Sequence, residues 1–265
     1  MTLFCFISRH YMPHTIEVAG KGGVGKTTTC GMIINYLCKK NKGPVLVVDA
    51  DANANLNEVL GVEMETSLGQ IREEIAHAEL KGTIPKGMSK ADYAEFKFNS
   101  ALIEEDDFDM IVMGRTQGQG CYCFVNGMLK TQVDKYARNY SYVVMDNEAG
   151  LEHVARGTLP HVDTMLLISD CSRRGIQAVA RIAEMVGELN LNPGQMGLIV
   201  NRAPGGVLDD GIKAEIEKHG LKLFGVLPHS DAVYRCDCDG EPSANLPDSE
   251  PMKTALKGIM TTIGL

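Results

Sequence analysis

Short runs of apolar residues alternate with longer amphipathic stretches along the whole chain. The runs are rich in β-branched and aliphatic side chains and have no polar face, a pattern typical of parallel strands that are buried on both faces. We expect strands over residues 15–19, 45–48, 110–113, 142–145, 165–168, 198–200 and 223–227. Between these runs apolar residues recur at helical spacing, as at Cys30, Ile33, Ile34, Leu37 and Cys38 and again at Ile176, Val179, Ala180, Ala183, Val186 and Leu189. The alternation predicts an α/β fold, a doubly wound and mostly parallel sheet of about seven or eight strands with helices on both faces.

The domain organisation follows from the absence of any internal repeat and of any linker rich in Pro, Gly or Ser. We expect a single domain over residues 14–265, preceded by an N-terminal extension of residues 1–13 in which Met12 is an alternative start. The segment of about 63–105 is less regular. We expect a helix near 68–80 and a mixed segment after it, together forming a mobile insertion.

A phosphate-binding loop is predicted directly after the first strand. Residues 20–27, Gly-Lys-Gly-Gly-Val-Gly-Lys-Thr, match G-x-x-x-x-G-K-[ST] and open the first helix. In such a loop the glycines let backbone N–H groups curl around a phosphate, Lys26 reaches the β- and γ-oxygens, and Thr27 offers its hydroxyl to Mg²⁺. The chain is therefore expected to be a P-loop NTPase whose nucleotide contacts come from Gly22, Gly23, Val24, Gly25, Lys26, Thr27 and Thr28.

A second lysine, Lys21, lies inside the loop. With it, residues 20–28 resemble the deviant P-loop of the family that contains MinD, ParA and the nitrogenase iron protein. The resemblance implies a homodimer that sandwiches ATP, in which Lys21 acts on the nucleotide of the opposite subunit and stabilises charge at the phosphates. A solvated loop charge is the alternative interpretation of Lys21.

Three aspartates follow predicted strands at the positions where this family keeps metal and water ligands. Asp49 and Asp51 come after strand 45–48, and Asp146 comes after strand 142–145. The resemblance implies that Asp51 orients the attacking water, that Asp49 supports hydrated Mg²⁺, and that Asp146 is a Walker-B ligand. Lys21, Lys26 and Asp51 are thus the expected catalytic residues. Taken singly, each aspartate is also a common helix cap.

The residues that bind the base of the nucleotide are assigned by resemblance alone. Asn201 and Arg202 follow strand 198–200 and are similar to the family's base-reading dipeptide, and Pro228 lies in a loop similar to the one that packs on the ring. Asparagine at a strand end is otherwise an ordinary turn residue. The preference for ATP over GTP rests on this resemblance.

The eight cysteines are too sparse for a disulfide scaffold, so we expect thiols or metal ligands. Cys121 and Cys123 form a Cys-x-Cys pair that offers two sulfurs, whereas structural zinc takes four ligands. A two-fold axis would supply the missing pair, and the resulting four-sulfur site would suit Zn²⁺, Ni²⁺ or an iron–sulfur cluster. Isolated thiols of this kind are also common as buried residues.

The residues around this motif resemble those of one particular group within the family. Gly-Cys-Tyr-Cys at 120–123, upstream of Asp-Asn-Glu-Ala-Gly-Leu-Glu-His at 146–153, resembles the CooC/AcsF group of ATPases. The resemblance implies an ATP-dependent metallochaperone that binds Ni²⁺ or Zn²⁺ at the dimer interface and has carbon monoxide dehydrogenase or acetyl-CoA synthase as its partner. Cys236 and Cys238 depart from the group's pattern, and we interpret them as incidental thiols rather than an auxiliary site.

The net charge of the chain helps to decide among the other functions found in this superfamily. With 26 Lys and Arg against 34 Asp and Glu, the net charge is -8, so we expect no nucleic-acid partner and no membrane surface. No apolar stretch is long enough to span a bilayer and no signal peptide is evident, so a cytoplasmic location is expected. Residues 251–265 carry only Lys253 and Lys257, unlike the basic helix of membrane-targeting relatives. Two alternatives stay open: a MinD/ParA-like positioning ATPase, and an iron–sulfur electron-transfer protein like the nitrogenase iron protein.

Overall fold

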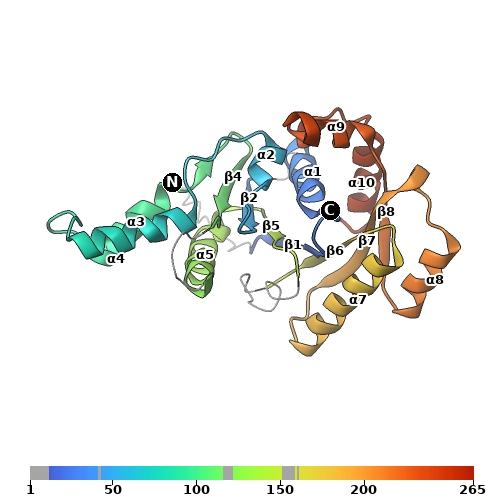
Figure 1. Ribbon diagram of the computed structural model, residues 1–265, viewed down its shortest axis with the longest axis horizontal. Coiled ribbons are helices and arrows are strands. Elements are labelled where there is room, and N and C mark those ends of the chain that lie inside the picture. The colour runs from blue at the N-terminus through green and yellow to red at the C-terminus, as the bar shows by residue number, and fades with distance from the viewer. Residues whose placement is uncertain (1–11, 41–42, 116–121, 151–158, 160) are drawn as a thin grey trace, which may run out of the picture.

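A single sheet organises the molecule in the computed structural model, which describes residues 12–40, 43–115, 122–150, 159 and 161–265 (Figure 1). Its eight strands lie in the order β3-β4-β2-β5-β1-β6-β7-β8. Their bounds are β1 His14–Gly20, β2 Val45–Ala50, β3 Ile103–Glu104, β4 Phe108–Val112, β5 Tyr142–Asn147, β6 Thr164–Asp170, β7 Gln195–Ala203 and β8 Leu223–Pro228. All seven predicted strands are confirmed. The additional strand, β3, is the one antiparallel member among the described pairs and lies at the edge beside β4.

Helices cover both faces of the sheet. Their bounds are α1 Lys26–Lys39, α2 Leu56–Leu60, α3 Leu68–Lys81, α4 Lys90–Asn99, α5 Tyr122–Tyr136, α7 Arg173–Glu188, α8 Asp210–Lys218, α9 Asp231–Asp239 and α10 Pro251–Thr262. Buried residues of α1, α2 and α10 form one apolar core with one face of the sheet, and those of α3, α5, α7 and α8 form a second core with the other face. Figure 1 shows α1 and α2 above the strands and α5 and α7 below them. The predicted doubly wound α/β architecture is therefore confirmed.

The strand order brings polar side chains from distant parts of the sequence to one edge of the sheet. β5 lies between β1 and β2, and in this register Asp146 is level with both Val18 of β1 and Asp49 of β2. The strands are parallel, so their carboxyl ends lie together. This is the edge at which doubly wound sheets bind ligands.

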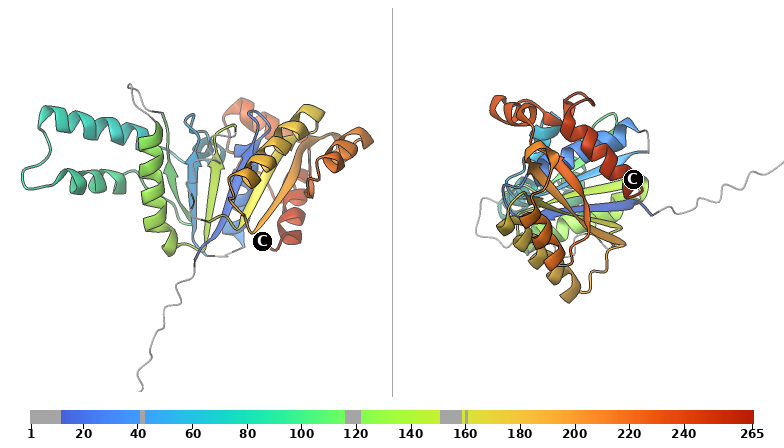
Figure 2. Two further views of the ribbon diagram at one scale, coloured as in Figure 1. Left: turned by 90° about the horizontal axis from the view of Figure 1, so that it is seen from below. Right: turned by 90° about the vertical axis from the view of Figure 1, so that its right-hand side faces the viewer.

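The prediction for residues 63–105 was wrong in its second half. After α3, the chain forms a second helix, α4, instead of a mixed segment, and Figure 2 shows the two helices projecting from the body as an arm. Each begins with a capping box, Ser67 with Gln70 and Ser89 with Asp92. The apolar face of α4 is short: Tyr93, Ala94 and Phe98 are half-buried and pack against the core, and no residue of the helix is fully buried. So short a pattern did not stand out in the sequence.

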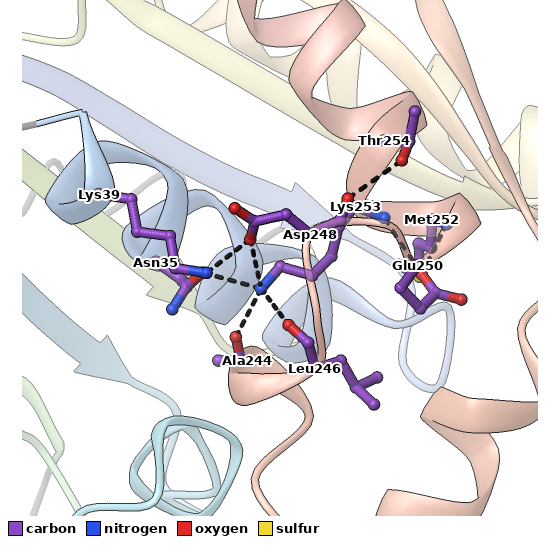
Figure 3. Close-up of polar contacts among 9 residues, drawn as sticks. All are labelled: Asn35, Lys39, Ala244, Leu246, Asp248, Glu250, Met252, Lys253 and Thr254. Carbon is purple, nitrogen blue, oxygen red and sulfur yellow. Dashed lines mark hydrogen bonds and ion pairs between the residues drawn. The ribbon is translucent and has the colours of Figure 1, made fainter.

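A buried lysine ties the C-terminal helix to α1, as Figure 3 shows. The Lys253 ammonium donates to Asn35 Oδ1 at 2.8 Å, to the Ala244 carbonyl at 2.9 Å and to the Leu246 carbonyl at 2.7 Å. Glu250, which directly precedes α10, accepts hydrogen bonds from the first backbone N–H groups of that helix and from the Ser230 hydroxyl. Together these bonds hold the segment that follows β8 against α1. None of the described helices is long and apolar enough to cross a membrane.

Candidate functional site

The loop between β1 and α1 offers backbone donors to an anion. Gly25, directly before α1, has a φ of 89°, in the left-handed region, and a Cβ at this position would lie 2.4 Å from Asn201 Nδ2. Only glycine meets both conditions without strain. No side chain caps α1 and no acidic residue lies in its first turn, so its first N–H groups are free of side-chain competition. Such a helix N-terminus binds phosphate well.

The two loop lysines differ in environment. Lys26 is buried, and its ammonium donates to the Lys21 carbonyl at 3.2 Å. Burial lowers the Lys26 pKa, while the charges of Asp146, Asp51 and Glu148 oppose that shift. Lys26 therefore lies among carboxylates at the carboxyl edge of the sheet. Lys21 is exposed, as are Gly22 and Gly23, whereas Val24 is buried beneath the loop.

Asp146 has the environment of a metal ligand. It is buried, and burial followed by the nearby charge of Asp49 raises its pKa to about 7. A hydrogen bond from the Thr27 hydroxyl lowers that pKa only in part. Asp146 Oδ1 has no hydrogen-bond partner among the described residues. An orphaned carboxylate oxygen beside a hydroxyl suits Mg²⁺, which prefers oxygen ligands, so Asp146 and Thr27 fit the expected ion.

Asp49 is already engaged by the backbone. Its Oδ1 accepts from the Asp51 N–H at 3.0 Å and its Oδ2 accepts from the Leu56 N–H at 3.1 Å. Burial raises its pKa to about 6 in spite of these bonds. The carboxylate thus shapes the turn from β2 into α2 and adds negative charge beside Asp146. Its predicted part in holding hydrated Mg²⁺ stays a prediction.

Asp51 lies close enough to the site to act on it. Its charge affects the pKa of both Lys26 and Asp146. Asp51 Oδ1 accepts two hydrogen bonds from Asn53, from its backbone N–H at 2.8 Å and from Nδ2 at 3.1 Å. The carboxylate is held in one orientation by its neighbour, as a water-orienting group requires.

The residues predicted to bind the base surround a pocket of about 300 Å³ beside the P-loop. It is lined by Gly25, Thr28, Asn201, Arg202, Pro228, His229, Ser230, Val233, Tyr234, Asp237 and Met252. Asn201 is buried and donates from Nδ2 to the Val24 carbonyl at 2.9 Å, and its Oδ1 accepts from the Arg202 N–H at 2.8 Å. One amide hydrogen and one lone pair stay available for a purine edge.

Part of this pocket was not predicted from the sequence. Val233 and Tyr234 come from α9, and Met252 comes from α10. Val233 and Tyr234 are three and four residues after the loop Pro228–Ser230, and that proximity was the available signal. Nothing in the sequence pattern places Met252 there, because the bond from Ser230 to Glu250 brings α10 to the pocket.

Glu17 is a further residue that was not predicted from the sequence. It lies buried in β1, three residues before the P-loop, and burial raises its pKa to about 7. Its Oε1 accepts from Asn147 Nδ2 at 2.8 Å, and the same amide donates to the Val18 carbonyl at 3.1 Å. A carboxyl inside an otherwise apolar strand was the signal. The pair ties the end of β5 to the strand that precedes the P-loop.

The predicted thiol site falls largely outside the described residues. Cys121 is not among them, and Cys123 is described only as part of α5, which begins at Tyr122. Within the part of the chain that the structure describes, no group of three or more His, Cys, Asp or Glu could hold a metal ion. The convergence of the two thiols stays a prediction.

The thiols of Cys236 and Cys238, both on α9, have different surroundings. Cys236 is half-buried and lines a second pocket, of about 240 Å³, with Thr27 and Thr28. Cys238 is exposed and has a hydrogen bond with the Tyr234 hydroxyl. Residues two apart on a helix do not share a face. This geometry favours the interpretation of the pair as incidental thiols.

Comparison with known proteins agrees with this geometry. Residues 16–243 match the model of the CobQ/CobB/MinD/ParA nucleotide binding domain. The chain is 40% identical to an uncharacterized ATP-binding protein of Methanocaldococcus jannaschii, over 94% of this chain and 97% of that protein. It is 27% identical to the carbon monoxide dehydrogenase accessory protein CooC of Rhodospirillum rubrum, over 80% of this chain and 90% of that one.

Among solved structures, the fold is similar to that of the septum site-determining protein MinD from Pyrococcus horikoshii, solved with Mg-ADP. The TM-score is 0.69 at 18% identity, and the match covers 96% of each chain. At this identity the likeness shows the fold, a P-loop NTPase fold of the MinD/ParA type.

Proposed function

Because this chain belongs to the CobQ/CobB/MinD/ParA nucleotide-binding family of ATPases, we propose that it is an ATP-dependent metallochaperone, which inserts nickel into carbon monoxide dehydrogenase or acetyl-CoA synthase. The observation that carries the proposal is the place where β4, the strand that precedes Cys121 and Cys123 in the sequence, ends. β4 pairs Val112 with Asp49, and the Met113 N–H donates to the Asp49 carbonyl at 2.8 Å. The likeness to CooC, which is named a carbon monoxide dehydrogenase accessory protein, supports the same function.

The residues of the P-loop would bind and orient ATP. The buried ammonium of Lys26 and the N–H groups at the start of α1 face the site of the phosphates and offset their charge. Thr27 and Asp146 would hold Mg²⁺, which when bound neutralises phosphate charge and aligns the oxygens. Asp51 orients a water for attack on the terminal phosphate, with Asn53 fixing its carboxylate. Asn201, Arg202 and Pro228 would receive the adenine in the adjoining pocket.

The second subunit completes the proposed site. Lys21 is exposed on the loop and would contact a nucleotide bound by another copy. In the closed homodimer, Cys121 and Cys123 of both copies would supply four sulfurs to one Ni²⁺ or Zn²⁺ ion, the cargo. ATP then promotes metal binding if the closed state holds the ion more tightly than the open state, and hydrolysis releases it.

Metal analysis with and without the thiols tests this function. Purified protein is mixed with Ni²⁺ or Zn²⁺ and MgATP, and the bound ion is counted per dimer after gel filtration. Wild-type protein is expected to bind about one ion per dimer, and a Cys121→Ser/Cys123→Ser variant about none, while both bind ATP. The Cys236→Ser/Cys238→Ser variant is the matched control and is expected to keep the ion. Equal stoichiometry in all three proteins would remove Cys121 and Cys123 from the site.

A positioning ATPase is the second candidate, favoured by the similarity of the fold to MinD. Against it, the apolar side of α10 is not available to a membrane, because Met252, Leu256 and Ile259 are buried against the rest of the protein. Sedimentation with anionic vesicles in the presence of ATP distinguishes the two, since a metallochaperone is expected to stay in the supernatant. The iron–sulfur alternative predicts a brown protein after anaerobic purification.

A further inference from the structure

Arg202 lies where β7 departs from regular strand pairing. The register of β7 with β8 shifts between Val200 and Ala203, and within this irregular stretch Arg202 has a φ of 58°, in the left-handed region. Arg202 is also the one exposed residue of β7. A left-handed backbone is costly for a residue with a long side chain, and such residues cluster at functional sites. Irregular pairing of this kind re-aims a side chain, so Arg202 has a direction that a regular strand would not give it.

The guanidinium of Arg202 reaches the P-loop. Its Nη1 donates to the Gly23 carbonyl at 2.9 Å. The preceding residue, Asn201, donates from Nδ2 to the next loop carbonyl, that of Val24, also at 2.9 Å. Asn201 Oδ1 in turn accepts from the Arg202 N–H at 2.8 Å. Two consecutive carbonyls of the P-loop are therefore held by two consecutive residues at the end of β7.

These two bonds fix the direction of N–H groups in the loop. A trans peptide is planar, so the carbonyl of one residue and the N–H of the next residue point to opposite sides. The bond from Arg202 thus directs the Val24 N–H, and the bond from Asn201 directs the Gly25 N–H. Backbone N–H groups whose directions are fixed in a turn of this kind form an anion-binding nest.

Packing does not order this part of the loop by itself. Gly23 is exposed, and a Cβ at this position would meet nothing within 4 Å. Gly25 differs, because a Cβ there would lie 2.4 Å from the Asn201 amide. Glycine loses more conformational freedom on ordering than any other residue. The bond from Arg202 therefore supplies order at Gly23 that contacts with neighbouring side chains do not.

We propose that Arg202 is a positioning residue, which holds the P-loop in its phosphate-binding shape through the Gly23 carbonyl. The inference rests on the part of the proposed function that places the phosphates of ATP in the P-loop, and it involves neither the thiols nor the metal cargo. Arg202 borders the base pocket, yet by this route it acts on the phosphate end of the nucleotide. The loop is ordered before ATP arrives, so less conformational entropy is lost on binding.

Hydrogen exchange in the nucleotide-free protein measures the order of the loop directly. Deuterium uptake of peptides that contain residues 20–25 is followed by mass spectrometry in wild type, Arg202→Ala and Arg202→Lys. We expect exchange in Arg202→Ala to be about threefold to tenfold faster, as for the loss of one hydrogen bond. Arg202→Lys is expected to be intermediate, since lysine keeps a charged donor but not the planar guanidinium. A residue that only contacts bound nucleotide would leave these rates unchanged.

Affinities for ATP and for inorganic tripolyphosphate separate the phosphate end from the base end. Both ligands, with Mg²⁺, displace a fluorescent ATP analogue from the protein. Arg202→Ala is expected to lose affinity about fivefold or more for each ligand, and the two losses are expected to agree within about twofold. The matched control is Arg235→Ala, which removes an exposed arginine from α9 next to Tyr234 of the same pocket. It is expected to keep both affinities.

Three results would overturn the inference. The first is equal exchange of the loop in wild type and Arg202→Ala. The second is a loss of affinity for ATP without a loss for tripolyphosphate, because Arg202 then serves the base. The third is a failure of tripolyphosphate to displace the analogue from wild type. The metallochaperone function fails separately, by the number of ions bound per dimer, whereas wild-type protein that binds no ATP would overturn both.

Discussion

Asp146 lies level with Asp49 on the neighbouring strand, and the charge of Asp49 helps to raise the Asp146 pKa to about 7. Burial is the larger cause of the shift. Two buried carboxylates at one edge of a sheet destabilise the folded state when both are ionised, and a divalent cation offsets that cost.

We expect Asp146→Asn to make the protein more stable and to lower its rate of ATP hydrolysis. A carboxyl whose pKa is higher in the folded state binds more protons there, so its destabilising effect is absent near pH 4 and develops as pH rises through about 7. Urea unfolding without Mg²⁺ should show Asp146→Asn to be more stable than wild type by about 1–3 kcal/mol at pH 8, and nearly equal at pH 4.5. Magnesium-dependent ATP hydrolysis should fall at least about 100-fold. Equal stability at both values of pH would contradict the burial argument.

Glu17 should show the same sign of pH dependence without a part in metal binding. Its pKa is raised to about 7 by burial, and Asn147 donates to it. Glu17→Gln keeps an acceptor for Asn147 but cannot ionise, so it should stabilise the protein by about 1–3 kcal/mol at pH 8 and have little effect at pH 5. Glu17→Met is the comparison, since it leaves the Asn147 amide without this acceptor and should be less stable than Glu17→Gln at pH 5. Thermal unfolding across pH 5–8 measures both.

Lys26 and Asp51 should separate binding from turnover. Lys26→Ala removes the buried cation of the P-loop, so we expect nucleotide affinity to fall at least about 100-fold. Asp51→Ala should keep ATP affinity within about threefold and lower kcat by about 100-fold or more, because it removes a water-orienting group. Isothermal titration and phosphate release measure the two effects. A loss of ATP binding in Asp51→Ala would mean that Asp51 supports the nucleotide itself.

Lys21 should act between subunits. The side chain is exposed on the P-loop, so Lys21→Ala is expected to leave the fold and single-subunit ATP binding intact. It should weaken ATP-dependent dimerisation by about tenfold or more, because a charge-assisted contact to phosphate is lost. Sedimentation velocity with and without ATP measures the monomer–dimer equilibrium, with exposed Lys86 as the site of a control substitution to alanine. If the variant has the same monomer–dimer equilibrium as wild type, Lys21 makes no contact between subunits and is a solvated loop charge.

The side chain of Lys253 should contribute far more to the free energy of unfolding than that of Lys257, the other lysine of α10. Its ammonium donates to two backbone carbonyls and to Asn35, and burial lowers its pKa. Lys253→Ala leaves these acceptors unpaired, so we expect a loss of about 2–4 kcal/mol in the free energy of unfolding. Lys257→Ala, at an exposed position on the same helix, should change it by less than about 0.5 kcal/mol. Because α10 contributes Met252 to the base pocket, Lys253→Ala should also weaken ATP binding.

The features that depend on consecutive residues were predictable from the sequence. Apolar runs gave all seven principal strands, and α3 at Leu68–Lys81 nearly matches its predicted bounds of 68–80. The P-loop was identified because its glycines, lysine and threonine are close together in the sequence and form one continuous motif. α4 was not predicted for a local reason as well, since its apolar face is limited to Tyr93, Ala94 and Phe98.

Tertiary structure alone decided which distant residues meet. The strand order places Asp49 level with Asp146, although 96 positions separate them along the chain, and nothing in either segment encodes that neighbour. The contact of Arg202 with Gly23 and the entry of Met252 into the base pocket arise in the same way. Burial has the same origin, so the raised pKa of Glu17 could not be read from its strand. Periodicity reports which side of an element is apolar, whereas pairing and desolvation depend on the elements that pack against it.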